Sequence, residues 1–231
     1  MDTETLKSRL RNEIGIHSEI IALKQTKEEP AGIEAYGDMN HICYMMGEVL
    51  EEGRTFYTTL KDHVCLLGCA ATGLDPSLQT MSAEQQQESQ EFHVGSINIF
   101  PTEALQAKAE EEAGRLFPKF TEVSRAVIMG PWGSFAEPEV LIILANPEQV
   151  HFLTRAYCFA TGSFVKGYAG MGVCRMLLPH AFLIREPTYT VSDRAWRRAL
   201  NLSPDQLTLV TPPDKLILML ETLEASKKQG A

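Results

Sequence analysis

The chain has 231 residues, of which 44% are hydrophobic, and this is enough to form an apolar core without disulfide bonds. Its net charge of −9 argues against nucleic acid or an anionic membrane as a partner, because both attract clustered Lys and Arg. The start of the chain lacks a secretory signal, and no apolar run reaches the roughly 18 residues that span a bilayer, so we expect a cytoplasmic protein.

The first part of the chain is predicted to alternate helices with short strands. Apolar residues at helical spacing predict one broken helix or two short helices over residues 5–27, ending before Pro30. A short strand, a helix, a β-branched strand and a small helix are then predicted at residues 33–36, 42–52, 55–59 and 65–71. Residues 75–92 are polar and rich in glutamine, which predicts a flexible or surface segment.

The second part carries clearer signals. A helix is predicted at residues 102–116, and the apolar runs 126–129 and 140–144 are typical of buried strands. Asn146 and Pro147 suit the first positions of a helix. The remaining predictions are a strand from 164, a helix interrupted by Pro179, a strand and a final helix, at residues 164–165, 174–183, 206–210 and 213–226.

This alternation predicts a single α/β or mixed α+β domain over residues 1–231, with a central mixed sheet flanked by helices.

Four of the five cysteines stand in segments that look suited to present them: Cys43, Cys65, Cys69 and Cys174. Because cytosolic thiols stay reduced and five is an odd number, we interpret them as thiols or metal ligands before disulfides. Thiolates bind iron–sulfur clusters, zinc or copper(I), and a cubane cluster usually takes four of them. The common signatures place cysteines two residues apart, however, whereas Cys65 and Cys69 are four apart and would share one helix face.

A reactive thiol is an alternative interpretation. Cys174 is expected to begin a helix beside Arg175, where amide groups and a cation lower the pKa of a thiol. Cys65 follows a histidine and an aspartate, which are the residue types of a general base and its orienting group. Such a protein would be a thiol-dependent enzyme acting on a small acidic molecule.

The third interpretation treats the cysteines as small buried hydrophobic residues, as free cysteines frequently are. Cys158 lies in the apolar helical pattern of residues 150–160 and is predicted to be buried for this reason.

Two further features are candidate contacts to a cofactor. Gly170 and Gly172 can form a turn whose backbone amides approach an anion. Arg194 belongs to a group of arginines around Trp196, and arginine beside an aromatic residue can bind a carboxylate or phosphate. The alternative for Arg194 is a surface helix whose arginines pair with acidic neighbours.

Motifs from about residue 33 to residue 223 agree in order and spacing with one family. They are Gly53-Arg-Thr-Phe-Tyr57, Asp62-His63, Cys65-x-x-Gly68, Ala126-Val127 with Pro131, Pro138-Glu-Val-Leu-Ile142, Asn146-Pro-Glu-Gln149, Ala156-Tyr157 with Gly162, Gly170-x-Gly-x-Cys174, Asp193-Arg194, and Pro212 with Lys215-Leu216. In these motifs the chain resembles the uncharacterised ArCR proteins of archaea and bacteria. Relatives often have Cys-Pro where Leu66 follows Cys65 here, and Cys69 is not a firm part of the pattern. The resemblance implies no reaction.

We therefore expect the protein to bind a cofactor or small ligand in a cysteine-lined pocket, with an iron–sulfur cluster in a redox or accessory role as one such cofactor. The alternatives are the thiol-dependent enzyme and a non-catalytic accessory protein that docks on a larger enzyme.

Overall fold

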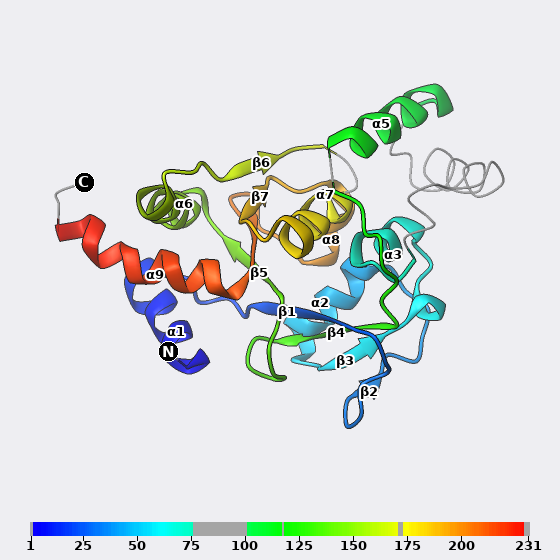
Figure 1. Cartoon of the computed structure of the whole chain (residues 1–231), viewed down its shortest axis with the longest axis horizontal. Coiled ribbons are helices and arrows are strands. Elements are labelled where there is room, and N and C mark those ends of the chain that lie inside the picture. Colours follow the sequence, from blue (N-terminus) through cyan, green and yellow to red (C-terminus); the bar gives the residue numbers. More distant parts are fainter. Residues whose placement is uncertain (1, 76–100, 117, 171–172, 229–231) are drawn as a thin grey trace.

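A mixed eight-stranded sheet in the order β2-β3-β4-β1-β5-β8-β7-β6 lies at the centre of the protein (Figure 1). The structure is a computed structural model, and it describes residues 2–75, 101–116, 118–170 and 173–228. The architecture confirms the predicted α/β class with a central mixed sheet flanked by helices.

The four middle strands are antiparallel to their neighbours: β4 (Ala126–Pro131), β1 (Ile21–Thr26), β5 (Val140–Ala145) and β8 (Leu207–Thr211). The outer strands are shorter: β3 (Phe56–Thr58), β2 (Glu34–Ala35), β7 (Thr188–Thr190) and β6 (Lys166–Tyr168). The pairs β2–β3 and β6–β7 are parallel. The sheet is therefore antiparallel in its centre and parallel only at its two edges.

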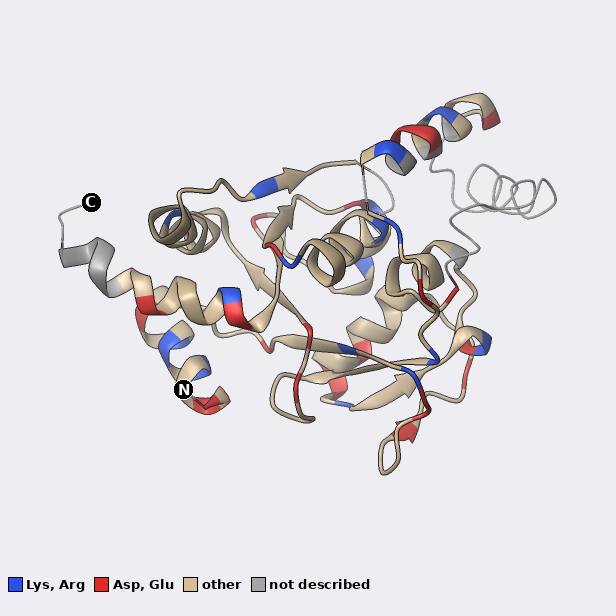
Figure 2. Ribbon diagram, in the orientation of Figure 1, with Lys and Arg blue, Asp and Glu red and all other residues tan. Residues whose placement is uncertain are grey.

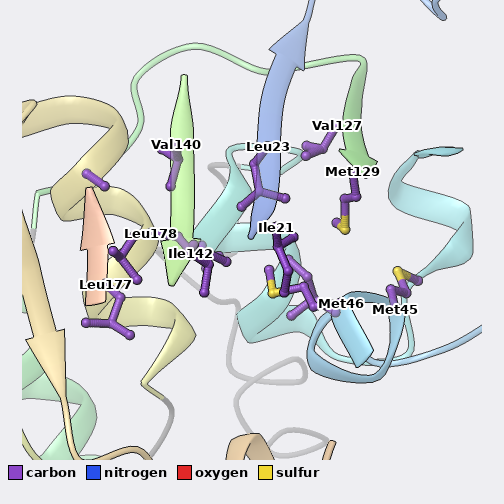
Figure 3. Close-up of a cluster of buried hydrophobic side chains, with 14 of the residues drawn as sticks. Ile21, Leu23, Met45, Met46, Val127, Met129, Val140, Ile142, Leu177 and Leu178 are labelled. Carbon is purple, nitrogen blue, oxygen red and sulfur yellow. The ribbon is translucent and has the colours of Figure 1, made fainter. Parts of the chain in front are cut away.

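One face of the sheet is covered by α2 (Ile42–Glu52), α3 (Leu66–Thr72), α7 (Cys174–Pro179) with the π-helical turn η5 (His180–Ile184), and α8 (Arg194–Ala199). Figure 3 shows the side chains of Ile21, Leu23 and Ile142 reaching from the sheet toward these helices. Met45 and Met46 of α2 belong to the same core. All four candidate cysteine ligands belong to the elements of this face.

The opposite face is covered by α1 (Thr3–Arg9) with the π-helical turn η1 (Leu10–Ile14), α6 (Pro147–Thr161) and α9 (Pro213–Lys228). Side chains alternate along β5, so that Leu141 and Ile143 pack on this face while Ile142 packs on the other. The central strands are therefore buried on both sides, which explains their continuous apolar sequences.

The helix α5 (Glu103–Leu116) projects away from the two cores (Figure 1). Its side chains Leu105 and Leu116 are exposed. Figure 2 shows basic and acidic residues interspersed over helices and loops, so the negative charge is not gathered in one element. None of the described helices is long and apolar enough to cross a membrane.

Elements with a local start or stop signal formed where they were predicted. The helix α2 spans residues 42–52 and ends at Gly53, which is left-handed. Asn146 and Gln149 form a reciprocal capping box at the start of α6. Leu105 donates its backbone N–H to Thr102 Oγ1 at the start of α5, within the helix predicted at residues 102–116.

The helix predicted over residues 5–27 is wrong in its second half. The chain leaves the helical turn at Gly15 and then forms β1, which pairs with both β4 and β5. The run Ile20-Ile-Ala-Leu23 fits the hydrophobic periodicity of a helix and that of a strand. Pairing with two neighbouring strands makes it a strand. The strand β7 and the helix α8 as a defined element were not predicted, and residues 76–92 of the predicted surface segment lie outside the described residues.

Candidate cysteine site

Three of the cysteines converge from three different helices. Cys43 is the second residue of α2, Cys65 is the N-cap of α3, and Cys174 is the first residue of α7. The pKa of the Cys174 thiol lies well above its usual value, first because of burial and then because Cys65, Asp193 and Cys43 are close enough to disfavour a second negative charge. The same neighbours act on Cys43, so the three sulfurs share one site with Asp193. We call this group the cysteine trio.

A backbone bridge sets the starts of α2 and α3 side by side. Asn40 and His63 form an isolated parallel bridge, and the amide of Val64 donates to the carbonyl of Asn40 at 3.1 Å. Since α2 begins two residues after Asn40 and α3 begins three residues after His63, this bridge brings Cys43 and Cys65 together.

Asp193 brings the third segment to the site. Its Oδ1 accepts the amide of Trp196 at 2.8 Å and thereby caps α8, while its Oδ2 accepts the amide of Val173 at 3.0 Å, directly before Cys174. One carboxylate therefore ties the start of α7 to the start of α8. Asp193 was not among the predicted site residues, although an aspartate before a helix is a recognisable N-cap signal.

The backbone before Asp193 is strained. Ser192 has φ of 70°, a left-handed conformation that is unfavourable for a residue other than glycine. It is held there by its amide, which donates to Thr190 Oγ1 at 2.9 Å, and by contact of its hydroxyl with Thr208 Oγ1 at 3.1 Å. Strain of this kind persists only where surrounding bonds enforce it, and here it fixes the orientation of Asp193.

Burial keeps the thiols of the trio protonated at neutral pH. It raises the pKa of Cys43 to about 12, with Cys65 and Asp193 acting in the same direction. It also raises the pKa of Cys65, against which the amide groups of Gly68 and Leu67 stabilise the thiolate. A metal ion binding here would have to displace these protons.

Cys69 is fully buried among the apolar residues of the core, and the pKa of its thiol is raised to about 12, first by burial and then by Cys65 one helical turn before it. Cys158 is only partly buried, so its predicted burial is wrong. The sheet-facing positions of α6 are Val150, Leu153 and Ala156 with Tyr157, and position 158 lies beside this stripe.

The predicted cofactor contacts are placed as follows. Gly170 is exposed with φ of 143°, a conformation that favours glycine, and Gly172 lies outside the described residues. Arg194 is exposed on the first turn of α8. Trp196 is buried instead, and its indole N–H donates to Thr208.

His63 adds a buried nitrogen beside the trio. Its side chain is 6% exposed, and Nε2 lies 3.0 Å from Thr58 Oγ1. Within the described residues Nδ1 is buried without a hydrogen-bond partner. Burial lowers the pKa of His63 to about 4, with nearby Asp62 opposing this shift, so the imidazole is neutral at physiological pH.

The trio does not have the geometry of a single-ion metal site. In the described part of the chain, no three His, Cys, Asp or Glu side chains are arranged to hold a metal ion. A tetrahedral ion with bonds of about 2.3 Å brings its sulfur ligands to within about 4 Å of each other. The ligands of an iron–sulfur cluster bind different irons and therefore stand farther apart.

Comparison with known proteins gives the family. The family described as Uncharacterised ArCR matches residues 9–222. The chain belongs to the ArCR family. This confirms the resemblance found in the motifs, and the trio and Asp193 all fall within the matched range of this ArCR protein. An uncharacterised protein of Methanocaldococcus jannaschii is 23% identical over 208 residues, which cover 88% of the ArCR chain and 85% of the relative. No solved structure matches the chain.

Proposed function

We propose that this ArCR protein binds a cofactor through Cys43, Cys65 and Cys174, and that the cofactor is a thiolate-ligated iron–sulfur cluster. The observation that carries the proposal is the convergence of three partly buried thiols from three separate helices. Cysteines that only fill space in a core have no reason to lie close together, whereas cysteines that bind one cofactor must do so.

The surroundings of the trio support ligand roles. The amides of Gly68 and Leu67 are directed at the Cys65 sulfur, and the amide of Arg175 is directed at Cys174. Hydrogen bonds of this kind stabilise negative charge on ligand sulfur atoms and tune the potential of a cluster. When bound, such a cluster supplies one-electron transfer. The chain itself holds the sulfurs in place and keeps water from them.

Asp193 makes binding depend on pH. Burial first, and the negative charge of Asp193 after it, raise the pKa of Cys43 and Cys174, so their protons must leave when metal binds. We therefore expect loading to improve as pH rises.

A thiol-dependent enzyme fits the site less well. A nucleophilic cysteine needs a lowered thiol pKa, whereas burial raises the pKa of all three members of the trio. The only observation in favour of this alternative is the position of neutral His63 two residues before Cys65.

Metal analysis after anaerobic purification tests the proposal. We expect matched iron and sulfide with absorbance near roughly 400 nm in the parent protein. Cys43→Ser, Cys65→Ser and Cys174→Ser should each lose most of the iron and sulfide. Cys158→Ser, on the opposite face of the sheet, is the matched control and should keep both. Cys69→Ala should also keep them at reduced stability, because Cys69 packs in the apolar core.

Background iron in the parent, after cluster reconstitution as well as on purification, would contradict the proposal. So would iron and sulfide that stay at the parental level in all three serine variants.

A further inference from the structure

Exposed apolar side chains gather where α2 and α3 begin. Met39, Tyr44 and Val64 are among the large hydrophobic residues that remain exposed. The amide of Val64 donates to the carbonyl of Asn40, so the segments before the two helices lie side by side. Side chains alternate along an extended segment, which places Val64 on the side opposite to buried His63. These residues therefore form one exposed apolar patch.

Three arginines lie at the starts of α7 and α8 or one turn beyond. Arg175 is the second residue of α7, Arg194 is the first residue of α8, and Arg198 follows one turn later. Within the described residues, none of the three forms an ion pair. The carboxylate between them is that of Asp193, and its two oxygens accept backbone amides, one of them the amide of Val173. The positive charges are thus left to face solvent.

The apolar patch and the arginines belong to neighbouring helices. The starts of α2, α7 and α8 meet at the trio. Farther along, a Cβ on Gly47 of α2 would lie 2.3 Å from the carbonyl oxygen of Ala199 in α8, so the absence of a side chain permits this close approach. Tyr44 lies one turn before Gly47, and Arg198 directly precedes Ala199. We call the combined surface the docking face, and it consists of Met39, Tyr44, Val64, Arg175, Arg194 and Arg198.

The composition of the docking face is that of a protein interface. Tyrosine, methionine and arginine are enriched where proteins contact each other, and grouped exposed apolar residues commonly mark such contacts. The whole chain has a net charge of −9, so these arginines are a local departure from its acidic character. An acidic partner is attracted to this face and repelled by the rest of the surface, and this fixes its orientation.

We infer that the docking face binds a small protein with an acidic surface, of the kind that carries single electrons. The inference rests on the proposed function for the redox character of the partner, whereas docking itself needs only the six side chains of the face. Cys43, Cys65 and Cys174 are partly buried, so the trio lies near this surface. Interfaces between redox proteins are small and transient, which agrees with a face of this kind.

Isothermal titration calorimetry with a plant-type ferredoxin, a small acidic protein that carries one electron, tests the inference. We expect binding at low ionic strength that weakens as salt is added. Arg198→Glu should weaken binding at least about tenfold, because it reverses a charge of the docking face. Tyr44→Ala should weaken binding without changing its dependence on salt, because it removes apolar contact area alone.

Arg11→Glu is the matched control. Arg11 is exposed on η1, which covers the opposite face of the sheet, and the substitution changes the net charge by the same amount. This variant should bind ferredoxin as the parent does. Equal affinities of Arg198→Glu and Arg11→Glu, or a parent that does not bind ferredoxin, would overturn the inference. If Arg198→Glu fails to fold, the comparison of Tyr44→Ala with Arg11→Glu decides in the same way.

Vesicles that contain phosphatidylserine test a membrane as the other anionic partner. We expect the parent protein not to sediment with them, because the acidic remainder of the surface is repelled. Sedimentation with vesicles that is lost in Arg198→Glu would overturn the inference in favour of a lipid surface. A parent that binds iron and sulfide without ferredoxin would lose only the inference. A parent that binds ferredoxin without iron would lose the proposed function, and with it the redox character of the partner.

Discussion

At the scale of the residue, burial decides the protonation of the groups that carry chemistry. The thiols of the trio and the imidazoles of His63 and His180 all have pKa values shifted toward their neutral forms, and desolvation is the largest cause in each case. From its sequence neighbours alone, the pKa of Cys174 was expected to be lowered, because a helix start and a nearby arginine favour a thiolate. The helix start does act on this sulfur through the Arg175 amide, but burial outweighs it.

His180 leads to a prediction for stability against pH. Burial lowers the pKa of His180, with Lys166 acting in the same direction, and its Nδ1 lies 3.3 Å from the Tyr168 hydroxyl. In the unfolded chain this histidine takes up a proton near its ordinary pKa of about 6.5. Below that pH the unfolded state binds a proton that the folded state refuses, so stability is complete above this pH and declines as pH falls.

We predict that the urea midpoint of the parent protein falls more between about pH 7.5 and about pH 5.5 than the midpoint of His180→Asn. The asparagine at position 180 cannot take up a proton in this range. Each protein is compared with itself, so a constant loss of stability in the variant cancels. Equal decreases in the two proteins would show that His180 does not contribute.

At the scale of the element, local signals were reliable where a helix carries its own cap. The capping box of Asn146 and the left-handed Gly53 were readable in the sequence because each acts within one turn. The conformation of β1 could not be predicted from local signals, because a run of apolar residues is compatible with both a buried helix and a buried strand. Its two neighbouring strands decided it, and they come from beyond residue 125.

Loss of the cap at Asp193 and loss of the cap at Asn146 should lower the stability of the protein equally, but only the first should affect cofactor binding. Asp193→Ala removes the cap of α8 together with its bond to the start of α7, while Asn146→Ala removes the cap of α6 on the other face. We predict that each lowers the free energy of unfolding by about 1–2 kcal/mol, measured by urea titration.

Only Asp193→Ala should also lower the iron content after reconstitution, because it alone releases the segment that carries Cys174. Equal iron content in these two variants would contradict the positioning role of Asp193.

At the scale of the whole molecule, two cores share one sheet. Ile142 packs in the core beneath α2 and α7, and its neighbour Leu141 packs in the core beneath α6 and α9. Since the middle strands supply side chains to both cores, neither core can lose its strands while the other stays intact. The single domain expected from the sequence stays a prediction, which unfolding experiments can test.

The two tryptophans of the chain report on the two cores separately. Trp196 is 2% exposed in the core that includes α8, and Trp132 is 4% exposed in the opposite core. We predict that in Trp132→Phe and in Trp196→Phe the fluorescence of the remaining tryptophan changes at the same urea concentration as the far-ultraviolet circular dichroism of that variant. A tryptophan that reports an earlier transition than the circular dichroism would show that its core unfolds as an independent unit.

The sequence by itself determined the class of the fold, the helices α2 and α6, the strands β4 and β5, and the family. These features depend on caps, on apolar runs and on the order of motifs, which are local or linear properties of the chain. Only the tertiary structure decided that Cys43, Cys65 and Cys174 meet while Cys69 joins the core. It also decided that His63 Nδ1 has no hydrogen-bond partner among the described residues and that Asp193 joins two helices. These outcomes depend on which faces of distant elements pack together, and no local pattern records that choice.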